Sequence, residues 1–132
     1  MNSAYGSTSP TPPAAQLAAI MTACGFSVRV WRDARVYLNG YGRDVRAYLE
    51  PRTLDPQAPA ADAKLVVSST WQAPRYNGLR CKGVKHAILK DLWTAQLISA
   101  PPPERWQDVT LADEAVTAQT IRPYTDRDAL SA

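Results

Sequence analysis

The fold of this chain is decided by one stretch, FSVRVWRDARVYLNGYGRDVRAYLEP, which runs from Phe26 to Pro51. Its side chains alternate between apolar and polar over three short runs, and this period of two is typical of strands with one buried face. The runs are separated by the tetrad Arg32–Arg35 and by Asn39–Gly42. Because Gly and Asn accept the positive φ that tight hairpin connections require, the stretch predicts three antiparallel strands joined by two turns.

Outside this stretch, three further segments have regular patterns. Residues 13–24 combine prolines at the start with good helix formers, and Gly25 follows as a C-cap, so we expect a helix there. Residues 64–71 are β-branched and apolar enough for a fourth strand. After a turn at Asn77-Gly78, residues 79–99 predict the longest helix, which three prolines at 101–103 should end. The sequence therefore predicts an α+β fold: a four-stranded antiparallel meander packed against an N-terminal helix and a long C-terminal helix.

The sequence divides the chain into an N-terminal arm, one domain and a C-terminal tail. With 132 residues, it fits one domain with a single core. We expect residues 1–12, rich in Ser, Thr and Pro, to be a disordered arm, and residues 13–100 to form the domain with a Pro/Ala-rich loop at 51–63. Residues 101–132 read as a Pro-rich linker and an acidic tail, in which a weak capping signal after Thr110 favours a short helix.

Composition limits the class of function. The formal net charge is +3 with a pI near 9.0, and basic residues gather between Arg29 and Lys90, which favours a polyanionic partner. Two cysteines and a start without the pattern of a signal peptide predict a reducing, cytoplasmic location. No apolar run reaches the roughly 18 to 20 residues that a membrane span needs, so no membrane partner is expected.

Arginine and aromatic residues are predicted to share the outward face of the first three strands. Guanidinium groups bind phosphate and aromatic rings stack on bases, so this face suits single-stranded nucleic acid or a nucleotide. A structural explanation competes with it, because Arg and Tyr also form cross-strand pairs that cover apolar area on any open sheet. The candidate binding residues of this region are Arg29, Trp31, Arg35, Tyr37, Arg43, Arg46 and Tyr48.

A second candidate site lies between Arg75 and His86, where cations surround a glycine turn before the long helix. Unpaired amides and the positive end of the helix dipole attract anions, so the segment predicts a phosphate contact, although it lacks the pattern of a Walker A loop. A solvated, lysine-bearing helix start explains the same residues. The candidate residues here are Arg75, Tyr76, Asn77, Arg80, Lys82 and Lys85.

The long helix has apolar residues on two sides. Val84, Ile88 and Leu92 lie on one stripe, and Leu89 and Trp93 on another. A helix that is apolar on both faces is usually buried on both. The second face is therefore expected to be covered by the N-terminal helix, by the segment around Trp106, or by a second copy in a homodimer.

Residues for catalysis are scarce. His86 is the single histidine, which leaves few components for a metal centre or a histidine-based triad. Cys81 lies between two cations at a helix start, an arrangement that can lower a thiol pKa, but a nucleophilic role has little other support. We therefore predict no enzyme, no cofactor, no metal and no catalytic residue.

Three hypotheses of function remain. The first is a non-enzymatic nucleic-acid-binding protein, the second a protein that binds a nucleotide or cyclic nucleotide, and the third an inhibitor that binds a host nucleic-acid-processing or defence complex. In its general style, a short basic α+β domain with low-complexity ends, the chain resembles many small phage and plasmid proteins. That resemblance implies no particular site residue.

Overall fold

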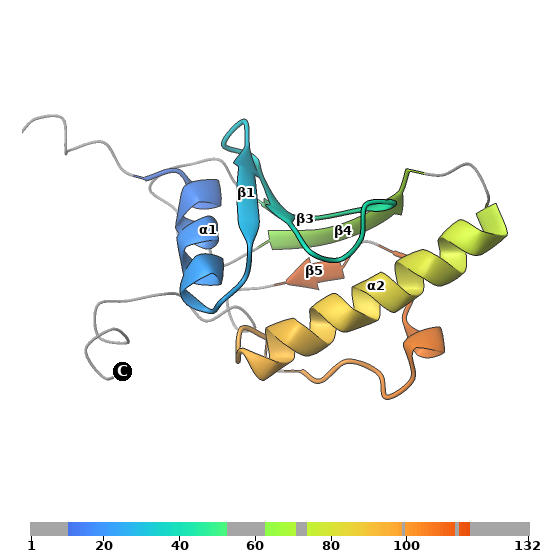
Figure 1. The fold of residues 1–132 in the computed structure, drawn as a ribbon. Coiled ribbons are helices and arrows are strands. Elements are labelled where there is room, and N and C mark those ends of the chain that lie inside the picture. Colours follow the sequence, from blue (N-terminus) through green and yellow to red (C-terminus); the bar gives the residue numbers. More distant parts are fainter. Residues whose placement is uncertain (1–10, 53–62, 71–73, 99, 113, 117–132) are drawn as a thin grey trace, which may run out of the picture.

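The computed structural model of the chain describes residues 11–52, 63–70, 74–98, 100–112 and 114–116, with residues 74–77 and 114–116 described by their backbone only. Two α-helices, five strands and a short 3-10 helix follow one another along this part of the chain (Figure 1). Their bounds are α1 (Pro13–Ala23), β1 (Val28–Trp31), β2 (Arg35–Leu38), β3 (Val45–Pro51), β4 (Ala63–Ser69), α2 (Pro74–Thr94), η2 (Trp106–Asp108) and β5 (Glu114–Val116).

The strands form one antiparallel sheet in chain order, β1-β2-β3-β4-β5. The predicted four-stranded meander is confirmed, and β5 extends it at the free edge of β4. Val30 pairs with Val36 and Tyr37 with Tyr48. These registers put the apolar positions of β1, β2 and β3 on one face, as the alternation predicts.

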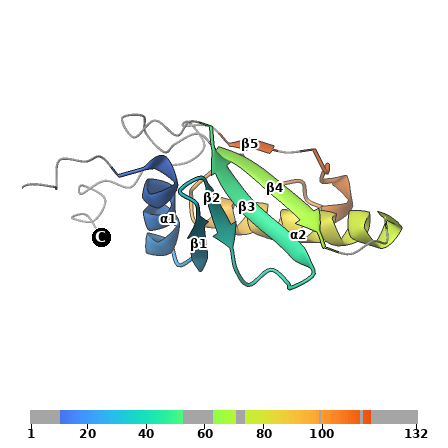
Figure 2. The same cartoon turned by 90° about the horizontal axis from the view of Figure 1, so that it is seen from above.

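Both helices cover that apolar face of the sheet, and the described elements leave the other face open (Figure 2). The core is a two-layer sandwich in which α1 packs on β1, β2 and β3 while α2 packs on β3 and β4. Its fully buried large side chains are Leu17, Met21, Val36, Leu49, Leu65, Ile88, Leu92 and Leu97.

Both helices end in the same way. Gly25, at φ +94°, and Phe26 follow α1, and their amides donate to the carbonyls of Thr22 and Met21. This pair of bonds is a Schellman motif, and Gly25 is the C-cap glycine that the sequence predicts. The motif recurs after α2, where the amides of Gln96, at φ +61°, and Leu97 donate to the carbonyls of Trp93 and Leu92.

The bounds of α2 differ from the prediction. The helix begins at Pro74 rather than after a turn at Asn77-Gly78, because a proline in the first helical turn needs no amide partner and is preset for helical φ. It ends at Thr94, well before Pro101. Burial of Leu97 beside Leu92 favours an early Schellman end over continuation to the prolines.

The predicted short helix after Thr110 is also wrong. Residues Glu114–Val116 form β5 instead, with Ala63 paired to Val116 and Leu65 to Glu114. The unpaired backbone groups along the edge of β4 offer hydrogen bonds that a weak local capping signal cannot outweigh.

The second face of α2 is partly covered by the same chain: Leu89 is buried, whereas Trp93 is 47% exposed. Residues 100–112 run back along the helix (Figure 1). His86 Nε2 lies 2.7 Å from the carbonyl oxygen of Pro103, and Lys82 Nζ donates to the carbonyl of Gln107 at 3.3 Å. Leu89 and Val109 are buried. Of the three predicted covers, the segment around Trp106 is therefore the one that the described residues contain.

Several predictions concern residues outside this description. They are the disordered arm, of which only Thr11 and Pro12 are described, most of the loop at 51–63, and the acidic tail beyond residue 116. In the described part of the chain, no helix is both long and apolar enough to cross a bilayer.

Candidate nucleic-acid interface

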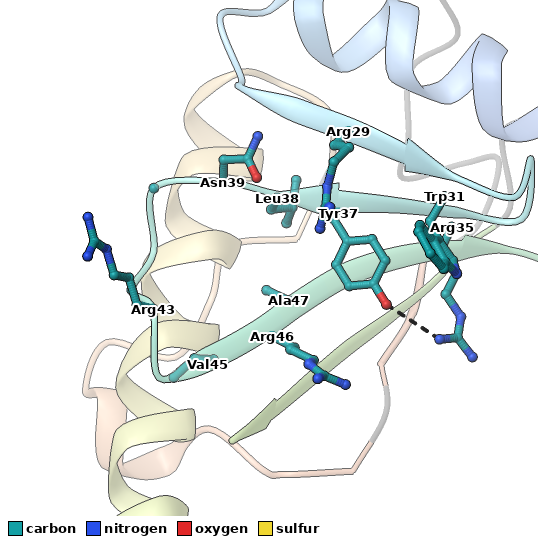
Figure 3. A pocket seen from close by; sticks show the side chains of 12 residues that line it. Arg29, Trp31, Arg35, Tyr37, Leu38, Asn39, Arg43, Val45, Arg46 and Ala47 are labelled. Carbon is teal, nitrogen blue, oxygen red and sulfur yellow. Dashed lines mark hydrogen bonds between the residues drawn. The ribbon is translucent and has the colours of Figure 1, made fainter. Parts of the chain in front are cut away.

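The registers of β1, β2 and β3 bring the predicted arginines and tyrosines together on the open face. Tyr37 lies opposite both Arg29 and Tyr48. The two tyrosine rings are tilted with centroids 5.1 Å apart, the Arg29 guanidinium lies 5.1 Å from the Tyr37 centroid, and that of Arg35 lies 4.7 Å from the Tyr48 centroid. The four side chains form a stack in which each ring has a cation over it (Figure 3 shows three of the four).

Trp31 lies at the end of this face and is 45% exposed. The guanidinium of Arg32 lies 5.0 Å from the centroid of its ring. Arg32 and Asp33 both have positive φ, and the amide of Ala34 donates to the carbonyl of Trp31, as in a type I′ turn. Arg32 was missed by the sequence analysis because a turn residue has no place in the alternation. The short spacing between the two strands is the signal that could have found it.

A concave region of about 640 Å³ opens on this face beside the stack (Figure 3). We call it the basic hollow, because four of its lining residues are arginines and no described lining residue is a carboxylate. The lining residues are Arg29, Trp31, Arg35, Tyr37, Leu38, Asn39, Gly40, Gly42, Arg43, Val45, Arg46 and Ala47.

The arginines of the basic hollow differ in whether they form an ion pair with a carboxylate. Arg35 Nε lies 3.5 Å from Glu50 Oε2. A hydrogen bond to Tyr37 is the main cause that raises the pKa of Arg35, so this side chain stays charged. Within the described residues, Arg29, Arg43 and Arg46 form no ion pair. All three are exposed and therefore free to meet an anion.

The loop that carries Arg43 is held to α2. Arg80 Nε and Nη2 donate to the two carboxylate oxygens of Asp44 at 3.1 and 3.3 Å. The hydroxyl of Tyr41 donates to Asp91 Oδ2 at 2.6 Å. The bond from Arg80 lowers the pKa of Asp44, and burial, with the bond to Asp91, raises the pKa of Tyr41. One wall of the basic hollow is thus fixed by charge-assisted bonds.

Gly42 shows how tightly this loop packs. A Cβ added there would lie 2.5 Å from Arg80 Nη2 and 2.9 Å from Asp44 Oδ1, and the residue has a φ of +123°. The positive φ favours glycine, and a Cβ would in addition force the ends of the Arg80 and Asp44 side chains to shift.

The second predicted site is not assembled by its described side chains. Arg80 contacts Asp44, and Lys82 donates to Gln107. Lys85 is 2% exposed and its ammonium donates to the carbonyls of Thr110 and Ala112 at 3.0 and 2.7 Å. Each of these three cations thus contacts a different part of the chain. The side chains of Arg75, Tyr76 and Asn77 lie outside the described residues.

The residues with catalytic chemistry are separated. Cys81 is buried, and burial is the main cause that raises the pKa of its thiol, which reverses the lowering that its sequence neighbours suggest. Cys24 is an exposed free thiol. The described residues contain no group of three or more His, Cys, Asp or Glu side chains that could hold a metal ion.

Comparison with protein-family models, with curated proteins and with solved structures finds no match to this chain. The arguments about function below therefore rest on the geometry and charge of its own residues.

Proposed function

We propose that this protein is a non-enzymatic nucleic-acid-binding protein that holds the phosphate backbone of a single strand in the basic hollow. The observation that supports this most directly is the set of three exposed arginines, Arg29, Arg43 and Arg46, which have no described ion pair around a concave surface without carboxylates. Guanidinium groups recognise phosphate oxygens through paired N–H donors, and phosphate contacts supply much of the affinity for nucleic acids.

The contacts that a bound strand can make on this face are limited by the stack of Arg29, Tyr37, Tyr48 and Arg35. Each tyrosine ring already has a guanidinium over it, so the rings hold the cations in place. A base would stack only by displacing one of these guanidinium groups. We therefore expect phosphate binding to contribute more than base stacking, and little preference for sequence.

The test is fluorescence anisotropy of a labelled 12-nucleotide oligo-dT and its RNA counterpart at increasing salt. If the three arginines each neutralise one phosphate, log K should fall with log salt at a slope of about −2. Arg43→Ala and Arg46→Ala should each weaken binding and reduce the slope by about 0.7. Arg105→Ala is the matched control, because Arg105 is exposed and lies outside the hollow.

A second candidate function is supported by the size of the hollow. Its volume of about 640 Å³ lies within the range of small-molecule sites, roughly 300 to 1,000 Å³. A nucleotide or cyclic nucleotide would use the same arginines. A melting temperature that rises with the logarithm of nucleotide concentration, together with no binding of oligonucleotides, would favour this alternative over the first.

Absence of binding to both ligands at low salt would contradict both proposals. It would favour the third hypothesis, an inhibitor of a host complex. Three further points stay predictions: the phage or plasmid origin, the homodimer, and a cytoplasmic location, with which the free thiols of Cys24 and Cys81 agree.

A further inference from the structure

A second concave region lies where both helices end. It also measures about 640 Å³. It is lined by residues 24–27, which connect α1 to β1, by residues 39–41 of the loop after β2, and by Asp91, Thr94 and Ala95 at the end of α2. Asn39 and Gly40 line this region and the basic hollow alike, so one short loop separates the two. We call it the second hollow.

The electrostatics of the second hollow are opposite to those of the first. The C-terminal end of a helix carries partial negative charge, and two such ends meet here. Neither helix has a basic residue in its last turn to balance that charge. The last turn of α2 instead contains Asp91, the only charged residue among the described lining residues. A carboxylate beside a helix C-terminus is unfavourable, and although Asp91 is exposed and partly screened by water, a bound cation would offset this interaction.

Asp91 is also oriented. The hydroxyl of Tyr41 donates to its Oδ2 at 2.6 Å, while Oδ1 has no hydrogen bond within the described residues. The aromatic side chains of Phe26 and Tyr41 belong to the lining. Aromatic walls around a carboxylate suit a cation that has an apolar body. A divalent metal ion would need several oxygen ligands, and only one carboxylate is present in the lining.

We propose that the second hollow binds an organic primary ammonium ion, with the ammonium group at Asp91 Oδ1 and the alkyl part against Phe26 and Tyr41. The bound cation neutralises charge that the two helix ends and Asp91 leave unbalanced. This site is separate from the basic hollow, and its ligand has the opposite charge.

The test is an NMR titration of ¹⁵N-labelled protein with 1,4-diaminobutane, against neutral 1,4-butanediol at the same ionic strength. The diamine should shift amide signals of residues 24–27, 39–41 and 91–95, and the diol should not. Asp91→Asn should weaken diamine binding about tenfold, because it removes the charge and keeps the shape. Asp108→Asn, an exposed carboxylate outside the hollow, is the control. Equal shifts from the diol, or equal affinity in the two variants, would overturn the proposal.

A second measurement needs no variant. The exposed thiol of Cys24 lines the second hollow, whereas Cys81 is buried. The measured quantity is the rate of modification by a trimethylammonium-ethyl methanethiosulfonate divided by the rate with the neutral methyl reagent. This rate ratio should be higher for Cys24 than for a free thiol such as glutathione. A ratio equal to or below that of glutathione would contradict a cation-binding hollow. Neither experiment contains nucleic acid, so its result is independent of the function proposed for the basic hollow.

Discussion

Arg80 is the residue that joins the loop between β2 and β3 to α2. Its guanidinium contacts both carboxylate oxygens of Asp44, and Nη2 also lies 3.4 Å from the carbonyl oxygen of Tyr41. The cation that the sequence analysis assigned to a phosphate contact is therefore used to shape the wall of the basic hollow. Arg43, one residue before Asp44, is exposed.

Substitution of Gly42 tests how tightly Arg80 packs on this loop. Gly42→Ala should lower the free energy of unfolding by about 2–3 kcal/mol, because positive φ and a steric clash add together. Gly40→Ala is the matched control: its φ is +95° but nothing lies within 4 Å of an added Cβ, so about 1 kcal/mol is expected. Chemical denaturation measures both values, and equal costs would show that the Arg80 contact imposes no constraint.

The two thiols should differ in reactivity. Cys24 is exposed, whereas Cys81 is buried with a raised pKa. Because the thiolate is the reactive form, iodoacetamide at pH 8 should alkylate Cys24 much faster than Cys81. Mass spectrometry of peptides over time gives both rates. Faster labelling of Cys81 would mean that its cationic sequence neighbours outweigh burial.

For single residues, the sequence predicts the direction of a side chain in a strand but not its contacts with distant residues. Alternation places Arg29, Tyr37 and Tyr48 on one face, because side-chain direction in a strand follows directly from position. It cannot say that Asp44 pairs with Arg80, since the two are 36 residues apart and meet only when α2 packs on the sheet. Such contacts between distant residues decide which arginines pair with a carboxylate and which do not.

At the scale of elements, the main feature is the segment 100–112 lying along α2. Its backbone carbonyls accept hydrogen bonds from Lys82 and Lys85. A buried ammonium is stable only with such partners. The basic residues of this helix face thus attach a segment of the same chain.

Lys85→Met should weaken that attachment. The substitution keeps the apolar stem but leaves the carbonyls of Thr110 and Ala112 without this donor, so we expect a loss of about 1–3 kcal/mol in the free energy of unfolding. Lys90→Met, an exposed site on the same helix, should change it by less than about 0.5 kcal/mol. Urea denaturation followed by circular dichroism compares the two. A neutral effect of Lys85→Met would indicate that the contact adds no net stability.

The two main helices and the four strands of the meander are confirmed, whereas their ends are less predictable. Gly25 marks the end of α1 because glycine suits the conformation of a C-cap. At the end of α2 that position is Gln96, a residue without such a preference, and the burial of Leu97 decides the end. The strand β5 was missed because its pairing with β4 depends on a distant edge rather than on its own three residues.

At the scale of the molecule, stability should depend on pH through Asp44. Its pKa is lowered from the usual 3.8, so the unfolded chain takes up this proton at a higher pH than the folded chain does. The stabilisation is complete above pH 3.8 and is lost as pH falls through the lower folded pKa. Between pH 5 and 2.5, Asp44→Asn should therefore lose less stability than the unmodified protein.

The control for this series is Glu104→Gln, because Glu104 is exposed and forms no ion pair within the described residues. Unfolding free energies from urea titrations at each pH supply the comparison. Parallel curves for Asp44→Asn and the unmodified protein would contradict the role given to the Asp44–Arg80 pair.

The order of the sheet has a consequence for how the chain reaches its fold. Each strand pairs with its neighbour in sequence. The connections within β1, β2 and β3 are short, whereas β4 and β5 are separated by α2 and η2. The entropy lost in closing short loops is small, and chains with local contacts fold faster than sheets with distant pairings. We therefore expect refolding on a time scale of roughly milliseconds. The hairpin of β1 and β2, which has the shortest connection and carries Arg29, Trp31, Arg35 and Tyr37 of the basic hollow, should be among the first parts to form.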